Sequence, residues 1–142
     1  MKKELLGEDG EILIFNRQTA RDLVFKQVFQ YDYTGEMIAV ELDDFAFSKD
    51  DLEYITAAIA GMAENMVDVD AKITENAKGY RLERLTKVCL AAMRVAVYEI
   101  CFMDDIPVGA SINEAVEIIK FYDDPKSAAY ANGVLGTIAK QS

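Results

Sequence analysis

Two groups of polar residues interrupt apolar helical patterns near the end of this chain, and they are the first candidates for chemistry. Asn113 and Glu114 stand at the start of one apolar helical face, and Asn132 precedes Gly133 inside the next. A carboxylate could transfer a proton in catalysis, but that role needs a second polarised group, and none is evident nearby. We therefore interpret Asn113, Glu114 and Asn132 as structural polar residues that bond helix ends or bridge two helices.

The chain has no histidine, and this absence removes several common kinds of site. It excludes Ser-His-Asp and Cys-His nucleophiles as well as histidine-ligated zinc. The two cysteines cannot form a structural zinc site alone, and the eight glycines fit no phosphate-binding loop pattern. We expect no metal and no cofactor, and nothing in the sequence favours an enzyme.

Length and composition predict one domain with its own core. The chain has 142 residues, of which 51% are apolar and 28% are charged. Its uncharged stretches are far shorter than the roughly 18 residues that span a bilayer, and its amino terminus lacks a signal-peptide pattern. We therefore expect a cytoplasmic protein without membrane segments, with Cys89 and Cys101 as reduced, buried thiols.

The net charge of −10 comes from one segment. Residues 32–75 contain twelve acids and two bases, whereas the rest of the chain is neutral. Residues 78–94 contain five bases and one acid, so other surfaces can be locally basic. The acidic segment is either an ordinary solvated helix face or a surface that suits a basic partner.

Apolar residues recur at helical spacing along most of the chain, which predicts an all-α fold, a compact bundle of six or seven helices. Thr19, Ser48 and Asp124 are the expected N-caps, with Pro125 in the first turn after Asp124. Residues 1–15 form an amino-terminal extension, in which residues 11–15 are either a strand-like arm or the approach to a helix. Residues 16–142 form the single helical domain. The expected helices cover approximately residues 19–34, 48–66, 68–77, 82–102, 110–122 and 125–139.

Four blocks of this sequence form a distinctive pattern. They are Ala20-Arg21-Asp22 with Phe29 and Tyr31, residues 93–100 (MRVAVYEI), residues 107–117 with SINEAVE, and residues 131–135 (ANGVL). The second block lies in the segment from residue 82 to about 102, which is apolar on nearly all sides and therefore typical of a buried central helix. Any one block would be a weak signal. Together, in this order and covering the chain from about Arg17 to Ala139, they resemble the bacterial transcription antitermination factor NusB family.

The resemblance implies an all-α fold of two packed three-helix subdomains and a role without catalysis. A NusB-like protein is expected to bind boxA-type single-stranded RNA together with the ribosomal protein NusE. The complex would act with RNA polymerase and other Nus factors to promote read-through of terminators in ribosomal RNA operons. The apolar segment at residues 12–15 leaves a homodimer open.

The resemblance also implies RNA-binding residues, namely Arg17, Arg21, Arg94 and Tyr130. Cations can bind phosphates, and aromatic rings can stack on bases. Other interpretations stay open: Arg17 and Arg21 as solvated surface cations, Arg94 as the partner of Glu99 or of a helix end, and Tyr130 as a core residue.

The match to the family is incomplete at its basic amino end. The family's opening arginine cluster is reduced here to Arg17-Gln18-Thr19, and an acidic extension precedes it. Each lost phosphate contact weakens RNA binding. An alternative function is therefore a NusB-like protein-interaction module that has lost RNA binding. A component working with a separate RNA methyltransferase chain is a third.

Overall fold

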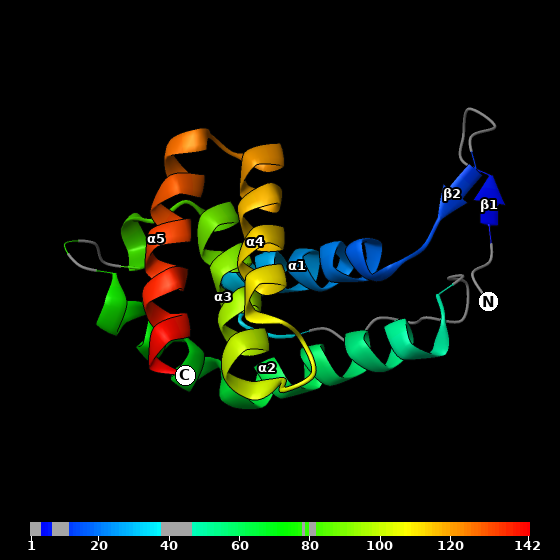
Figure 1. Ribbon diagram of the computed structural model, residues 1–142, viewed down its shortest axis with the longest axis horizontal. Helices are drawn as coiled ribbons and strands as arrows, with labels where there is room; N and C mark the ends of the chain where they lie inside the picture. Colours follow the sequence, from blue (N-terminus) through cyan, green and yellow to red (C-terminus); the bar gives the residue numbers. More distant parts are fainter. Residues whose placement is uncertain (1–3, 7–11, 38–46, 78, 80–81) are drawn as a thin grey trace.

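The computed structural model describes residues 4–6, 12–37, 47–77, 79 and 82–142, and within them the fold is helical (Figure 1). A short antiparallel hairpin of β1 (Glu4–Leu6) and β2 (Ile12–Ile14) precedes the helices. Of the two interpretations left open for residues 11–15, the structure shows the strand-like one at residues 12–14. The remaining elements are α1 (Arg17–Thr34), α2 (Lys49–Asn76), the 3-10 turn η1 (Leu82–Arg84), α3 (Lys87–Phe102), α4 (Val108–Tyr122) and α5 (Pro125–Gln141).

Local capping explains where the helices begin. The side chain of Ser48 accepts a hydrogen bond from the backbone N–H of Asp51, and the Asp124 carboxylate accepts one from that of Ser127. Both predicted caps are confirmed. The prediction for α1 is wrong, because Asn16 is the N-cap and Thr19 donates its backbone N–H to the Asn16 side chain. The helix therefore begins at Arg17, two residues earlier than expected.

The two helices predicted over residues 48–77 are joined at a kink and together form α2. It contains 28 residues and a kink at Asn65, whose backbone leaves helical geometry (φ −115°, ψ 15°). The Asn65 side chain donates a hydrogen bond to the Gly61 carbonyl, which satisfies a backbone acceptor next to the kink. Val69 and Ile73 continue the buried face of the first half of α2, which includes Ile55 and Met62, so packing keeps both halves on the same core.

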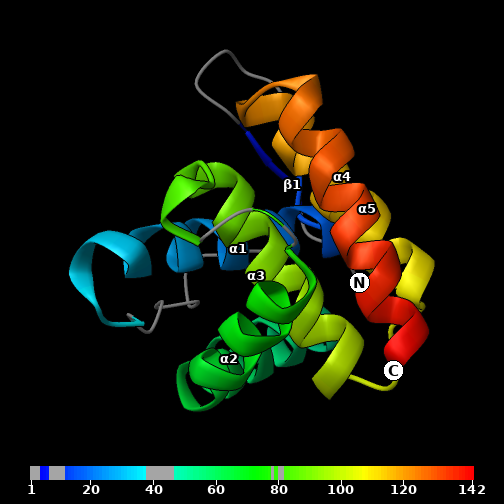
Figure 2. The same cartoon turned by 90° about the vertical axis from the view of Figure 1, so that its left-hand side faces the viewer.

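Helix α3 lies at the centre of the molecule and contacts each of the other four α-helices of the described chain. Helices α1 and α2 pack on one another and on α3, while α4 and α5 form an antiparallel pair that also contacts α3 (Figures 1 and 2). The described residues contain five α-helices, or six when the two halves of α2 on either side of the kink are counted separately. The all-α fold is thus confirmed, and the division into two three-helix subdomains stays a prediction.

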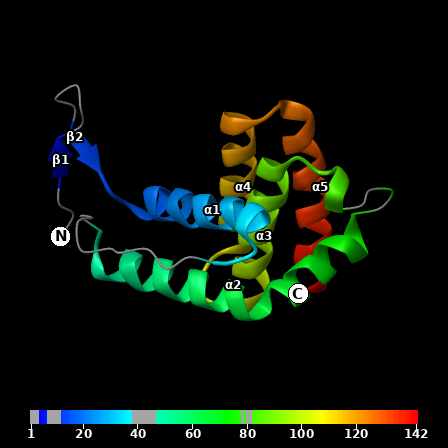
Figure 3. The same ribbon diagram turned by 180° about the vertical axis from the view of Figure 1, so that it is seen from behind.

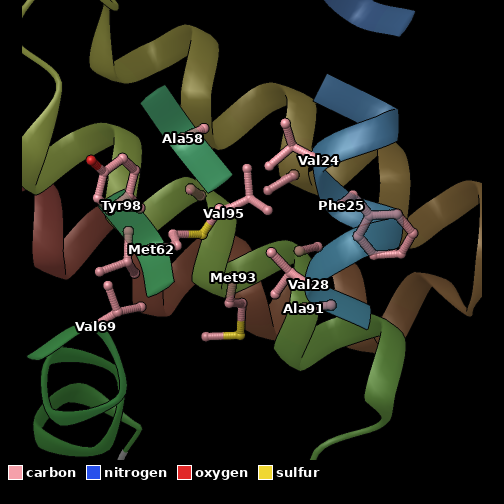
Figure 4. Packing of buried hydrophobic residues seen from close by; sticks show 14 of the residues in the cluster. Val24, Phe25, Val28, Ala58, Met62, Val69, Ala91, Met93, Val95 and Tyr98 are labelled. Carbon is pink, nitrogen blue, oxygen red and sulfur yellow. The ribbon is translucent and has the colours of Figure 1, made fainter. Parts of the chain in front are cut away.

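The core is built where the apolar stripes of α1 and α2 meet the all-apolar α3. Val24 and Val28 of α1 lie on one side of α3, and Met62 of α2 lies on its other side (Figure 4). Every residue from Cys89 to Glu99 is buried, as predicted for a central helix. Both cysteines are free thiols, but Cys101 is only partly buried, which corrects that part of the prediction.

The hairpin lies beyond the amino end of α1, away from α4 and α5 (Figure 3). Next to it, the ring of Phe15 stacks on that of Phe47, which precedes α2, with 5.1 Å between the centroids. Residues 1–3 and 7–11 of the predicted extension lie outside the described residues. Lys78 and Arg81 of the basic segment also lie outside them.

Candidate functional site

Arg21, one of the predicted RNA-binding residues, is buried in a polar cluster at the junction of four helices. Its Nε and one terminal nitrogen donate to the two carboxylate oxygens of Glu99, at 2.8 and 3.0 Å. The hydroxyl of Tyr54 donates to Glu99, and so does that of Ser111, at 2.8 Å. We call Arg21, Tyr54, Glu99 and Ser111 the Glu99 cluster. It joins α1, α2, α3 and α4 through one carboxylate.

Charge is balanced inside the Glu99 cluster. Burial lowers the pKa of Arg21, but the hydrogen bond and charge of Glu99 more than offset this, so the pKa is raised. Burial also raises the pKa of Tyr54, and the Glu99 charge adds to the effect, so its hydroxyl keeps its proton and donates it. Arg21 has a residue exposure of 6% and Glu99 of 1%, which leaves neither group open to an RNA phosphate.

Arg17, one turn earlier on α1, is in a more open environment. Its Nε donates to the Asp51 carboxylate at 2.9 Å, and its guanidinium lies 4.6 Å from the centroid of the Tyr54 ring. The side chain of Arg17 is 37% exposed, whereas that of Asp51 is 9% exposed. Among the three candidate arginines, Arg17 is therefore the one that solvent and ligands can reach.

Arg94 is held by two acids of the acidic segment. Its Nε and one terminal nitrogen donate to the two carboxylate oxygens of Asp70, at 2.8 and 2.9 Å, and its other terminal nitrogen donates to Asp32 at 3.3 Å. Asp32 also pairs with Lys87. The interpretation of Arg94 as the partner of Glu99 is wrong, because Arg21 occupies that carboxylate. The side chain of Arg94 is only 7% exposed.

The remaining candidates are spread over α4 and α5. Tyr130 is half-buried on α5, while Asn113 and Asn132 are exposed and make no side-chain hydrogen bond among the described residues. Glu114 is partly buried and lines a surface hollow. The expected structural role of Asn113 and Asn132 is thus not supported. The polar residues that hold helices together are those of the Glu99 cluster.

The sequence predictions did not include a continuous row of five aromatic rings across α1 and α4. Neighbouring rings in the row have centroids 5.5, 6.2, 5.5 and 4.8 Å apart. The row ends in exposed side chains, since Tyr33 is 66%, Tyr122 43% and Phe121 79% exposed. We call this the aromatic row, and its members in order are Tyr33, Phe29, Phe25, Tyr122 and Phe121.

A hollow of about 540 Å³ lies beside one end of the aromatic row, between α1 and α4. Asp22, Glu114 and Glu117 line it together with Phe121 and Tyr122. Asp22 pairs with Lys26 and accepts a hydrogen bond from the Tyr122 hydroxyl at 3.3 Å. This surface is both aromatic and acidic, so it suits a partner with apolar and cationic side chains rather than a polyanion.

The site can bind but has no arrangement for catalysis in the part of the chain that the structure describes. Its most buried carboxylate, Glu99, is fully occupied by hydrogen-bond donors. Among those same residues no group of three or more acids or cysteines could hold a metal ion. None of the described helices has the length and apolar character needed to cross a membrane.

Comparisons with known proteins agree with this architecture. The NusB family model matches residues 18–140. The transcription antitermination protein NusB of Acetivibrio thermocellus is 38% identical over 125 residues, covering 88% of this chain and 86% of that protein. The protein of the same name from Clostridium novyi is 37% identical over 131 residues, covering 88% of this chain and 98% of that protein.

Solved structures show the same fold. The structure of T. maritima NusB matches with a TM-score of 0.78 and 32% identity, covering 89% of this chain and 92% of that one. A crystal structure of the antitermination factors NusB and NusE in complex with double-stranded RNA matches with a TM-score of 0.73 and 25% identity. The match covers 89% of this chain and 97% of that one. The all-α chain with its shared central helix therefore belongs to the NusB family of non-enzymatic transcription antitermination factors.

Proposed function

We propose that this protein binds boxA-type single-stranded RNA jointly with a NusE-type ribosomal protein. The complex acts with RNA polymerase and other Nus factors to promote read-through of terminators in ribosomal RNA operons. Support comes from membership of the NusB family and from the similar chain that was solved with NusE and RNA. The aromatic row beside the acidic hollow is the observation in this chain that carries the proposal.

The exposed ends of the aromatic row, Tyr33 at one end and Tyr122 with Phe121 at the other, are the docking surface for the NusE-type partner, while Phe25 between them is buried. Exposed aromatic side chains are enriched at the centres of protein interfaces, where they bury large areas with little loss of conformational freedom. The carboxylates of Asp22, Glu114 and Glu117 surround one end of the row and would repel RNA phosphates. They favour a cationic protein surface, which is the charge typical of a protein that binds ribosomal RNA.

RNA contacts on this chain centre on Arg17, with Tyr130 as a second candidate. Arg17 is the most exposed of the three candidate arginines, and a guanidinium can bind phosphate or stack on a base. Arg21 and Arg94 act through the fold, because carboxylates already neutralise them. Because only one of the three candidate arginines is accessible, this chain binds RNA weakly alone, and the partner supplies further contacts.

One observation favours a second function, a protein-interaction module without RNA binding. All three arginines implied by the family resemblance are paired with carboxylates of this same chain. In that case the aromatic row still binds the partner, but RNA adds nothing to the complex.

The test is a titration of labelled boxA-type RNA with this protein, with the partner, and with both, at two salt concentrations. We expect tight, salt-sensitive RNA binding only when both proteins are present. Association of the two proteins with no RNA bound to this chain in either salt would establish the second function instead.

Two variants test the docking surface directly. Phe121→Ala and Tyr33→Ala should each weaken association with the partner by about tenfold, as expected for an interface residue of moderate importance. Phe102→Ala is the matched control, because Phe102 is 42% exposed but lies outside the row. Equal affinities for all three variants would exclude the aromatic row as the docking surface, provided that circular dichroism shows all of them folded.

A further inference from the structure

Asp51 occupies the position next to Arg17 that a phosphate would need. It accepts a hydrogen bond from the Arg17 Nε at 2.9 Å, and the Arg17 guanidinium lies against the Tyr54 ring. The carboxylate is an anion placed within the same chain, so an approaching RNA phosphate must compete with it. Any phosphate contact made by this nitrogen requires the Asp51 bond to break or to be shared.

The position of Asp51 is fixed, whereas that of Arg17 is not. Asp51 lies in the first turn of α2, where its backbone N–H bonds to Ser48 and the helix dipole stabilises its carboxylate. Its side chain is 9% exposed, compared with 37% for that of Arg17. Arg17 is also a long side chain that can rotate about several bonds. The arginine can therefore leave, while the carboxylate stays.

We propose that Asp51 limits the RNA affinity of this protein by competing with RNA phosphate for Arg17, an inference that rests on the proposed RNA binding. Without the carboxylate, the guanidinium remains against Tyr54, and its Nε is available to an anion. The contact acts as an intramolecular substitute for RNA. It lowers binding to phosphate groups in general and leaves RNA bound only where other contacts add to that of Arg17.

The pair is weak enough to be displaced. Ion pairs with a partly exposed partner contribute little net free energy, so its loss should change RNA affinity by a small factor. We expect Asp51→Asn to tighten RNA binding by about two- to fivefold. One additional phosphate contact should also steepen the dependence of log affinity on log salt by about 0.7, the value for single strands.

The experiment measures the affinity of labelled boxA-type RNA for the full chain with its NusE-type partner, across a salt series. The variants are Asp51→Asn, Arg17→Gln and the double variant. Asp68→Asn is the control, because Asp68 is an exposed acid of the same helix with no ion pair among the described residues. It removes the same charge without freeing Arg17. Thermal unfolding verifies that each variant is folded, and Asp51→Ser replaces Asp51→Asn if the latter is not.

The outcomes separate this inference from the proposed function. Tighter, more salt-dependent binding by Asp51→Asn that disappears in the double variant supports the inference. The inference is overturned if the wild type binds RNA and Asp51→Asn does not change the affinity. It is also overturned if Asp68→Asn raises the affinity as much as Asp51→Asn does. Both results leave the proposed function intact. No RNA binding by either the wild type or Asp51→Asn overturns both.

Discussion

Arg17 and Arg21 lie one turn apart on α1, and both guanidinium groups lie near the ring of Tyr54, at 4.6 and 5.6 Å from its centroid. Each also pairs with a carboxylate, Asp51 or Glu99. They differ in exposure and in the number of bonds. Arg21 makes two hydrogen bonds inside the protein, and its side chain is 7% exposed, whereas Arg17 makes one and is 37% exposed.

This difference determines what each arginine can do. A buried charge must keep its partner, because an unpaired ion in the interior is strongly destabilising. A partly exposed charge can exchange its protein partner for water or for a ligand at little cost. Arg21 is therefore part of the fold, and Arg17 is available for binding, although the two occupy neighbouring turns of the same helix.

The largest expected effect comes from Glu99→Gln. This change leaves the Arg21 charge buried without a counter-ion. It also replaces one of the two carboxylate oxygens with an amide nitrogen, so either Tyr54 or Ser111 loses its acceptor. We expect the free energy of unfolding to fall by about 3–5 kcal/mol, measured by urea denaturation. Glu117→Gln, at an exposed position, is the control. A loss below about 1 kcal/mol would mean that Arg21 is not confined as described.

Arg94→Gln should have the second largest effect. It removes charged hydrogen bonds to Asp70 and Asp32, but those carboxylates are partly exposed, and Asp32 keeps Lys87. The expected loss is about 2–3 kcal/mol in the same denaturation experiment. If Arg94→Gln lowered the free energy of unfolding more than Glu99→Gln does, the loss would depend on burial of the arginine rather than on burial of its carboxylate partner.

A pH experiment tests the contribution of Asp32, the carboxylate that pairs with both Arg94 and Lys87. The hydrogen bond from Lys87, opposed by burial and aided by Arg94, lowers the pKa of Asp32. Its stabilisation is therefore present above the unfolded-state pKa of about 3.9 and is lost as pH falls through the lower folded value. Asp32→Asn should cost on the order of 1 kcal/mol at pH 7 and less near pH 3, measured by urea denaturation. An equal cost at both values would contradict this assignment.

Arg17→Gln should have the smallest effect on stability, under about 1 kcal/mol. Its effect on RNA binding by the complex with the partner should instead be several-fold, because a phosphate contact is lost. Denaturation and RNA titration of the same preparation measure both quantities. If Arg17→Gln destabilised the protein as much as Arg21→Gln does, Arg17 would be a structural residue like Arg21 and would not be available for binding.

Helices and N-caps were predictable from the sequence where all the residues that form them lie within one turn of each other. Ser48 and Asp124 bond backbone groups within their own first turn, so the sequence contains all the participants. Asn16 was not predicted as the N-cap of α1, because Thr19, three residues later, is also a good capping residue. The break predicted between two helices near residue 67 is the kink of α2 at Asn65, and packing of Val69 and Ile73 keeps the second half on the same core.

The environment of the arginines could not be read from the sequence. Arg21 and its partner Glu99 are 78 residues apart, and Arg94 and Asp70 are 24 residues apart. One signal was present, because an acid within the apolar central helix needs a buried cation or several donors. The aromatic row was partly visible as well, since Phe25, Phe29 and Tyr33 follow one another at intervals of four residues.

The Glu99 cluster has a consequence for how the chain folds. Its bonds join residues separated by 78, 45 and 12 positions, so large loops must close before Glu99 has all its donors. Losing any one of α1, α2 or α4 leaves a buried ionic group incompletely satisfied. These helices and α3 should open as one cooperative unit, with amide hydrogens that exchange together. Among the described residues α5 supplies no donor to Glu99, so its amides can exchange through separate, lower-energy openings.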